Sequence, residues 1–277
     1  MNGAWNAYRR NLAAVLGGVL FIAIVLMTLV GPQLYRVDPF ETLAAPLLPP
    51  GQPDAPLLGT DYLGRDLLAG IIHGARATLL VGVLAALLAM AIGVGIGAIA
   101  GYYGARTDRA LMRVTELFQV LPPVLLAMVL IVLFKPTLAT QAVAIGAASW
   151  TGAARLTRGE FMRIKGLDFV AASRTMGAHD AHLIWRIILP MALPPLIVSA
   201  TLTVGVAILF ESGLSFLGLS NPNIMSWGMM IGGNRPYMLE AWWATTIPGA
   251  AIFLTVVSIS LVGDGLNEAF NPRLRER

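Results

Sequence analysis

Long apolar runs dominate the pattern of hydrophobic and polar positions along this chain. None of them alternates between apolar and polar residues as a half-buried strand would. The six main runs are residues 12–30, 79–100, 117–134, 138–154, 187–210 and 241–262. A helix needs about 20 apolar residues to cross the hydrocarbon core of a bilayer, where only helices and closed barrels satisfy their backbone groups. The pattern therefore predicts an all-α, polytopic membrane protein with about six transmembrane helices.

The first run is similar to the apolar stretch of a secretory signal peptide, because Arg9 and Arg10 precede it. A signal peptide carries only about 7–15 apolar residues there and ends at a cleavage site of small residues. This run has 19 residues and no such site. We therefore predict that it is retained as the first span.

Basic residues are divided unequally between the two sides that the spans define. If the N-terminus lies inside, 14 of the 19 Lys and Arg residues fall in inside segments and five fall outside. Cytoplasmic loops carry an excess of Lys and Arg, so both termini are predicted to be cytoplasmic. The chain then divides into residues 1–30 with the N-terminus and first span, an external segment at 31–78, and a core of five spans at 79–277 with a cytoplasmic loop at 155–186.

Composition excludes several classes of function. Hydrophobic residues make up 57% of the chain and charged residues 12%, against roughly 25% charged residues in soluble proteins. The absence of cysteine excludes disulfides, thiolate metal sites and thiol catalysis. A net charge of +4 without a basic stretch interleaved with aromatic residues argues against nucleic acid as a partner. No GxxxxGKS/T sequence occurs, so ATP is predicted to bind elsewhere and the chain is predicted not to be an enzyme.

The largest inside loop contains a predicted short helix that ends at a glycine. Residues 169–176 combine Phe169 and Val170 with small residues, and Gly177 suits the turn that stops a helix. A second amphipathic stretch follows at 182–188 and leads into the fifth span. A short helix on the membrane surface with exposed small residues allows another protein to approach closely.

This loop resembles the EAA motif of binding-protein-dependent ABC importer permeases. The motif consists of Glu-Ala-Ala, three residues, Gly, nine residues and Ile-x-Leu-Pro. The chain departs from it in having Ala171 at the Glu position and Ser173 at the second Ala position. The resemblance implies that an ATPase couples to the matching residues: Ala171, Ala172, Ser173, Gly177, Ile187, Leu189 and Pro190.

Other segments resemble the dipeptide, oligopeptide and nickel permeases of the same family. Residues 58–66 read Leu-Gly-Thr-Asp-Tyr-Leu-Gly-Arg-Asp, and further matches follow in order at 100–104, 213–218, 226–228, 263–266 and 271–274. The resemblance implies a fold like that of type I ABC importer permeases, in a cytoplasmic (inner) membrane of the bacterial type. The substrate stays open among dipeptides, oligopeptides, nickel or its chelates and related small solutes.

The resemblance also implies the partners of the chain. A second, homologous permease would pair with it as a heterodimer within the lipid bilayer. Two cytoplasmic ATPase subunits would bind ATP and Mg²⁺, so no cofactor is expected on this chain. A solute-binding protein would deliver the substrate from outside.

Glu211 lies near the outer end of the fifth span, and an ionisable residue near a membrane indicates function by default. His73 and Arg76 border the second span on the same side, so we consider the three as candidate pathway or gate residues. The alternative is a carboxylate that is hydrogen-bonded within the bundle. No metal site is assigned, because Met225, Met229 and Met230 are more typical of an apolar contact.

An ion-coupled secondary transporter is the alternative function. Such a protein would need buried carboxylates at mid-membrane and an internal repeat. The second, fourth and sixth apolar runs contain no acidic residue, which argues against this alternative.

Overall fold

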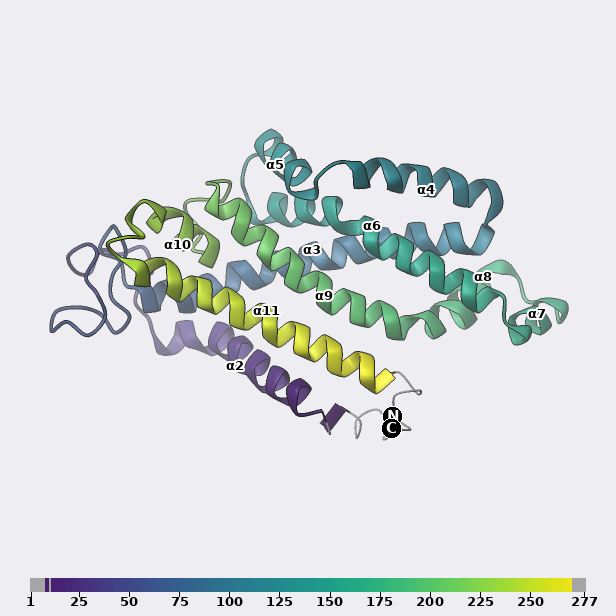
Figure 1. The fold of residues 1–277 in the computed structure, drawn as a ribbon, viewed down its shortest axis with the longest axis horizontal. Helices are drawn as coiled ribbons and strands as arrows, with labels where there is room; N and C mark the ends of the chain where they lie inside the picture. The colour runs from purple at the N-terminus through teal and green to yellow at the C-terminus, as the bar shows by residue number, and fades with distance from the viewer. Residues whose placement is uncertain (1–7, 10, 271–277) are drawn as a thin grey trace.

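Long helices make up most of the structure, a computed structural model that describes residues 8–9 and 11–270. Residues 35–66, the part of the predicted external segment that is not helical, form loops at one end of the molecule, near α10, and α7 projects from the opposite end (Figure 1). The last match to the permease family, residues 271–274, lies outside the described residues. In chain order the helices are α2 (Leu12–Leu34), α3 (Leu67–Tyr103), α4 (Ala105–Val120), α5 (Pro123–Phe134), α6 (Leu138–Lys165), α7 (Asp168–Thr175), α8 (Asp180–His182), a π-helical stretch (Leu183–Ile188), α9 (Leu189–Phe216), α10 (Trp227–Asn234), a 3-10 turn (Arg235–Tyr237) and α11 (Trp242–Phe270).

Within the described part of the chain, four helices are long and apolar enough to cross a membrane: α2, α3, the continuous helix Asp180–Phe216 and α11. A fifth candidate arises if α4 and α5 together form one broken span. The remaining predicted span, residues 138–154, lies in α6, which is long enough but less apolar. Because α6 packs against α3, α5 and α9, fewer of its side chains need to suit lipid.

Several helices extend beyond the predicted spans, and α3 and α6 do so by the largest number of residues. α3 begins at Leu67 rather than near residue 79, because Asp66 caps it by accepting a hydrogen bond from the Leu68 amide at 2.8 Å. α6 continues to Lys165 rather than ending near residue 154. Apolar runs mark only the part of a helix that suits lipid, so polar extensions at either end were not predicted.

Two adjacent prolines, Pro122 and Pro123, separate α4 from α5. Pro123 occupies the start of α5, where its missing N–H costs no helical hydrogen bond. The two helices meet at an angle of 84°. Arg158 of α6 holds α4 in place through a two-point ion pair with Asp108, in which Arg158 Nη2 donates to Oδ2 at 2.7 Å.

Small residues bring α3 and α6 into close contact. A β-carbon on Gly97 would lie 2.3 Å from the carbonyl oxygen of Ala154, and one on Gly93 would lie 2.5 Å from the β-carbon of Ala153. Glycine at these positions lets the two backbones approach each other closely. α3 therefore fixes the position of α6 and of the loop that follows it.

Candidate functional site

The α7–α8 segment, residues 166–182, projects from one end of the bundle (Figure 1). α7 ends at Thr175, and Gly177 follows with a φ of +91°. A β-carbon there would meet no atom within 4 Å, so the left-handed backbone, rather than lack of space, favours glycine. The predicted short helix and its glycine stop are both confirmed.

The small residues of α7 face away from the bundle. Ala171, Ala172 and Gly177 are exposed, whereas Val170 is 3% exposed and attaches the helix. Ser173 is half-buried, and its hydroxyl donates to the carbonyl oxygen of Phe169 at 2.8 Å. α7 is therefore held on one face and open to a partner on the other.

Tyr102, in the last turn of α3, anchors the α7–α8 segment. Its hydroxyl donates to Asp180 Oδ1 at 2.5 Å and accepts from Arg174 Nη2 at 2.8 Å. Arg174 and Asp180 also form an ion pair at 3.5 Å. Lys165 Nζ donates to the carbonyl oxygen of Tyr102, whose side chain is buried at 2% exposure. One residue therefore connects the end of α6 with α7 and α8.

An apolar cluster beneath this anchor joins α3, α6, α7 and the start of α9. Ile187 and Leu189 pack against it while partly buried, and Pro190 follows on the exposed side of the helix. The seven residues that match the EAA motif thus fall into two groups, four on the α7–α8 segment and three at the base of α9. The buried members of the cluster are Tyr102, Phe161, Ile164, Val170, Leu183, Ile188, Ala192 and Leu196.

Three large apolar side chains near the small residues were not predicted as part of the site. Phe169 is 42% exposed, Met176 is 80% exposed and Trp185 is 68% exposed. Exposed apolar side chains beyond the end of a bundle indicate a contact surface. Phe169 and Trp185 adjoin apolar residues that pack inward, such as Val170 and Ile184, so the sequence pattern did not distinguish them from core residues.

Glu211 is buried in α9, with 1% of the residue exposed. Ser215 donates to its Oε1 at 2.8 Å and Ser212 donates to its Oε2 at 3.4 Å. Thr78 in α3 and Ser226 before α10 lie near this carboxylate, and their hydroxyls accept from the amides of Trp227 and Met229. The structure therefore favours the alternative interpretation, in which Glu211 joins three elements of the bundle.

Among the described residues, neither His73 nor Arg76 forms a hydrogen bond or an ion pair with Glu211. His73 Nε2 lies 3.3 Å from the carbonyl oxygen of Tyr35. Both residues line a separate cleft of about 380 Å³ together with Phe40. Among the described residues, no group of three or more His, Asp or Glu side chains could hold a metal ion.

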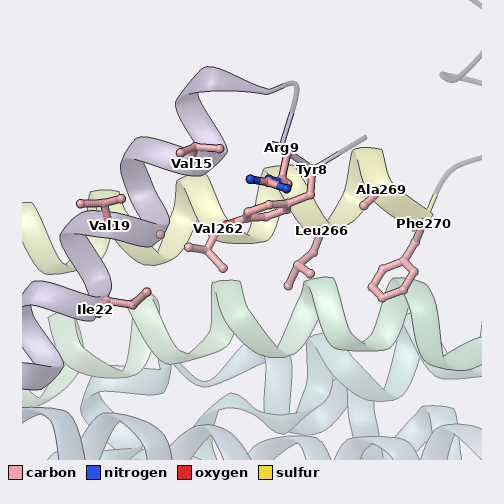
Figure 2. Close-up of a pocket in the computed structure, with 10 residues that line it drawn as sticks. Tyr8, Arg9, Val15, Val19, Ile22, Val262, Leu266, Ala269 and Phe270 are labelled. Carbon is pink, nitrogen blue, oxygen red and sulfur yellow. The ribbon is translucent and has the colours of Figure 1, made fainter. Parts of the chain in front are cut away.

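An apolar groove of about 670 Å³ lies between α2 and α11 (Figure 2). Tyr8 and Arg9 lie at one end of it, and the remaining lining is apolar, including Val19 and Leu266. A binding site for a polar solute needs placed hydrogen-bonding groups. This groove therefore suits contact with lipid or with another protein better than passage of a polar solute.

Two family models match the chain. One, described as "Binding-protein-dependent transport system inner membrane component", matches residues 93–276. The other, described as "N-terminal TM domain of oligopeptide transport permease C", matches residues 1–59.

Individual proteins are also similar to the chain. The di/tripeptide transport system permease protein DppC of Pseudomonas aeruginosa is 39% identical, over 98% of this chain and 91% of that protein. The dipeptide transport system permease protein DppC of Bacillus subtilis is also 39% identical, over 98% of this chain and 85% of that protein. A solved chain of the MetNI methionine ABC transporter in an inward-facing conformation matches this chain with a TM-score of 0.58 and 19% sequence identity. The match covers 70% of this chain and 93% of that chain, and it shows that the two share a fold.

Proposed function

The chain belongs to the family of binding-protein-dependent transport system inner membrane components, and from this membership we propose that it conducts peptides as one permease subunit of an ATP-driven importer. Peptides are the proposed substrate because the relatives that cover most of this chain are named as permeases for dipeptides and tripeptides. Neither of these names mentions nickel, so we set nickel aside as the main substrate.

The α7–α8 segment gives this proposal its main structural support. It presents Ala171 and Ala172 on an exposed short helix at one end of the bundle. The helix Asp180–Phe216 runs without a break from this segment toward the other end. In our proposal a cytoplasmic ATPase docks on α7, and the base of α9, including Pro190, transmits the movement. Both chain termini then lie in the cytoplasm, and the external segment lies outside.

ATP and Mg²⁺ act on the partner ATPases, and this chain carries out no covalent chemistry. It offers one α7–α8 segment and so engages one ATPase, while a second, homologous permease engages the other. When ATP draws the two ATPases together, each moves the α7 bound to it, and the long helices tilt to open the pathway outward. A solute-binding protein delivers the peptide to that opening, and hydrolysis restores the inward-facing state.

Reconstituted uptake tests this proposal. Proteoliposomes would contain this chain, a candidate partner permease and the two ATPases, with the binding protein and a radiolabelled dipeptide outside. We expect uptake that requires ATP and the partner permease, and a non-hydrolysable ATP analogue serves as the control. Uptake driven by an ion gradient without ATP would favour the secondary transporter. Uptake with this chain as the only permease would contradict the heterodimer.

A further inference from the structure

Residues 58–66, which resemble a motif of the peptide and nickel permeases, fold into a tight external turn. Gly59 and Gly64 have φ values of +80° and +75°, which favour glycine. The Thr60 hydroxyl accepts from the Leu48 amide at 2.9 Å and donates to the carbonyl oxygen of Ala45 at 2.8 Å. These contacts give the glycines and the threonine of the motif a structural role.

The two aspartates of the motif also hold the backbone. Asp61 Oδ1 accepts from the amides of Leu63 and Arg65, both at 2.8 Å. Asp66 caps α3 and accepts a hydrogen bond from the Tyr35 hydroxyl at the end of α2. Burial raises the pKa of the Asp61 carboxyl, and the two amide hydrogen bonds and the nearby Arg65 charge oppose that change. Both carboxylates are thus engaged within the turn and at its junction with α2 and α3.

The Arg65 side chain is the exception. Its Nε is buried without a hydrogen-bond partner, and its guanidinium lies 5.1 Å over the ring of Phe40. Among residues 8–9 and 11–270, no carboxylate pairs with it within ion-pair distance. The Arg65 charge acts on the Asp61 carboxyl of the same turn, but its buried Nε has no acceptor among the described residues, and such a donor calls for an explanation.

Arg65 lines a cleft of about 360 Å³ at the external end of the molecule, within the usual size range of small-molecule sites, roughly 300–1,000 Å³. The cleft lies between the external turn, the end of α9 and α10. Arg65 and Asp61 line it, together with polar residues such as Asn234 and an apolar wall of Phe216, Met225, Met229 and Met230. A substrate that arrives from outside in the proposed orientation would meet this cleft before it entered the bundle.

We propose that this cleft receives the carboxyl-terminal residue of the peptide, with its α-carboxylate on Arg65 and its side chain against the methionines. The inference rests on the proposed function and names the part of the substrate that is recognised. The planar guanidinium matches a carboxylate through two parallel hydrogen bonds, and Arg65 lines the cleft that would hold this carboxylate. Methionine side chains adapt to many shapes. The cleft therefore recognises the carboxylate common to all peptides and accepts different side chains at the carboxyl-terminal residue of the peptide.

The test uses the complete importer in proteoliposomes, with the binding protein loaded with trialanine or with trialanine amide, and loading checked beforehand. Arg65→Gln should lower the maximal uptake of trialanine about tenfold or more, the loss expected for a hydrogen bond to a charged group. The concentration of loaded binding protein that gives half-maximal uptake should not change. The preference for trialanine over its amide should disappear, and Arg65→Lys should keep part of it.

Arg36→Gln is the matched control. Arg36 also lies in the predicted external segment, but it is exposed and its Nε donates to the carbonyl oxygen of Gln33 at 3.2 Å, away from the cleft lining. We expect wild-type uptake from this variant, and co-purification of all subunits confirms assembly of each variant. If Arg65→Gln raises only the half-saturating concentration, Arg65 docks the binding protein and the inference is wrong. If Arg65→Gln lowers the uptake of trialanine and of its amide equally, Arg65 only shapes the turn and the inference is wrong. If the wild-type importer moves no peptide at all, the proposed function itself fails.

Discussion

Replacing Tyr102 with phenylalanine removes a single hydroxyl group from the base of the α7–α8 segment. That hydroxyl donates to Asp180 and accepts from Arg174, and hydrogen bonds to charged groups contribute about 1.5–3 kcal/mol each. The side chains of Arg174 and Asp180 are both 53% exposed, so water replaces much of what is lost. We therefore expect the attachment of the segment to weaken by about 1–2 kcal/mol, which corresponds to a roughly 5–30-fold larger detached fraction.

Hydrogen–deuterium exchange of the complex in nanodiscs measures this change directly. Amides of residues 168–182 should exchange faster by about the same factor, because exchange reports the local opening free energy. Amides in the middle of α3 and α6 should not change. The variant should also retain less of the partner ATPase during purification, since the docking helix is less often in place.

Tyr103→Phe is the matched control for this prediction. Tyr103 is 52% exposed, its ring stands edge-on to that of Tyr102 at 5.2 Å, and within the described residues no hydrogen bond of its hydroxyl is found. Exchange and ATPase retention should match the wild type. If Tyr102→Phe also leaves both unchanged, the apolar cluster alone holds the segment and the anchoring role of Tyr102 is refuted. Faster exchange throughout the protein would instead indicate global destabilisation.

Three further predictions concern other parts of the molecule. Gly177→Val should leave the chain inserted and paired with its partner permease but reduce ATPase retention, because a left-handed backbone costs a residue with a side chain about 1–2 kcal/mol. Gly177→Asn should have a smaller effect. Normal transport with normal ATPase retention in the valine variant would contradict the role of the turn. Glu211→Ala should lower the free energy of unfolding of the purified complex by about 1–3 kcal/mol, since buried hydroxyls lose their acceptor. Glu211→Gln should stay close to wild type in both stability and uptake. A stable glutamine variant without uptake would show that Glu211 has a direct role in transport. Reporter fusions at residue 277 and within residues 40–56 should report opposite sides of the membrane, and agreement between them would overturn the orientation.

The sequence predicted those features that depend on local pattern. Apolar runs located the long helices, since lipid contact requires apolar side chains over a fixed length. The spacing from Ala171 to Pro190 located a short exposed helix, and Gly177 marked its end because a positive φ favours glycine. The third predicted span, 117–134, was not confirmed as one straight helix, because it contains the break at Pro122 and Pro123 between α4 and α5.

Contacts between distant residues could not be predicted in the same way. Tyr102 is 72 residues from Arg174 and 78 from Asp180 in the chain, so nothing near it in sequence indicates that it anchors them. Glu211 lies near the end of α9, as its place after the fifth apolar run predicted, but that run did not indicate its hydrogen-bond partners. Hydrogen bonds depend on which face of each helix meets the next, and the structure pairs Glu211 with serine hydroxyls rather than with His73.

The unbroken helix Asp180–Phe216 has 37 residues, which at 1.5 Å per residue gives a length of about 55 Å. Asp180 meets the anchor at one end, and Phe216 lines the cleft of Arg65 at the other. Two binding events that favour different positions of one rigid element are thermodynamically linked, and the linkage is reciprocal. The factor by which a docked ATPase changes the affinity of the cleft for a peptide must equal the factor by which the peptide changes the affinity of α7 for the ATPase. A measurement at either end of this helix therefore gives the coupling free energy for both.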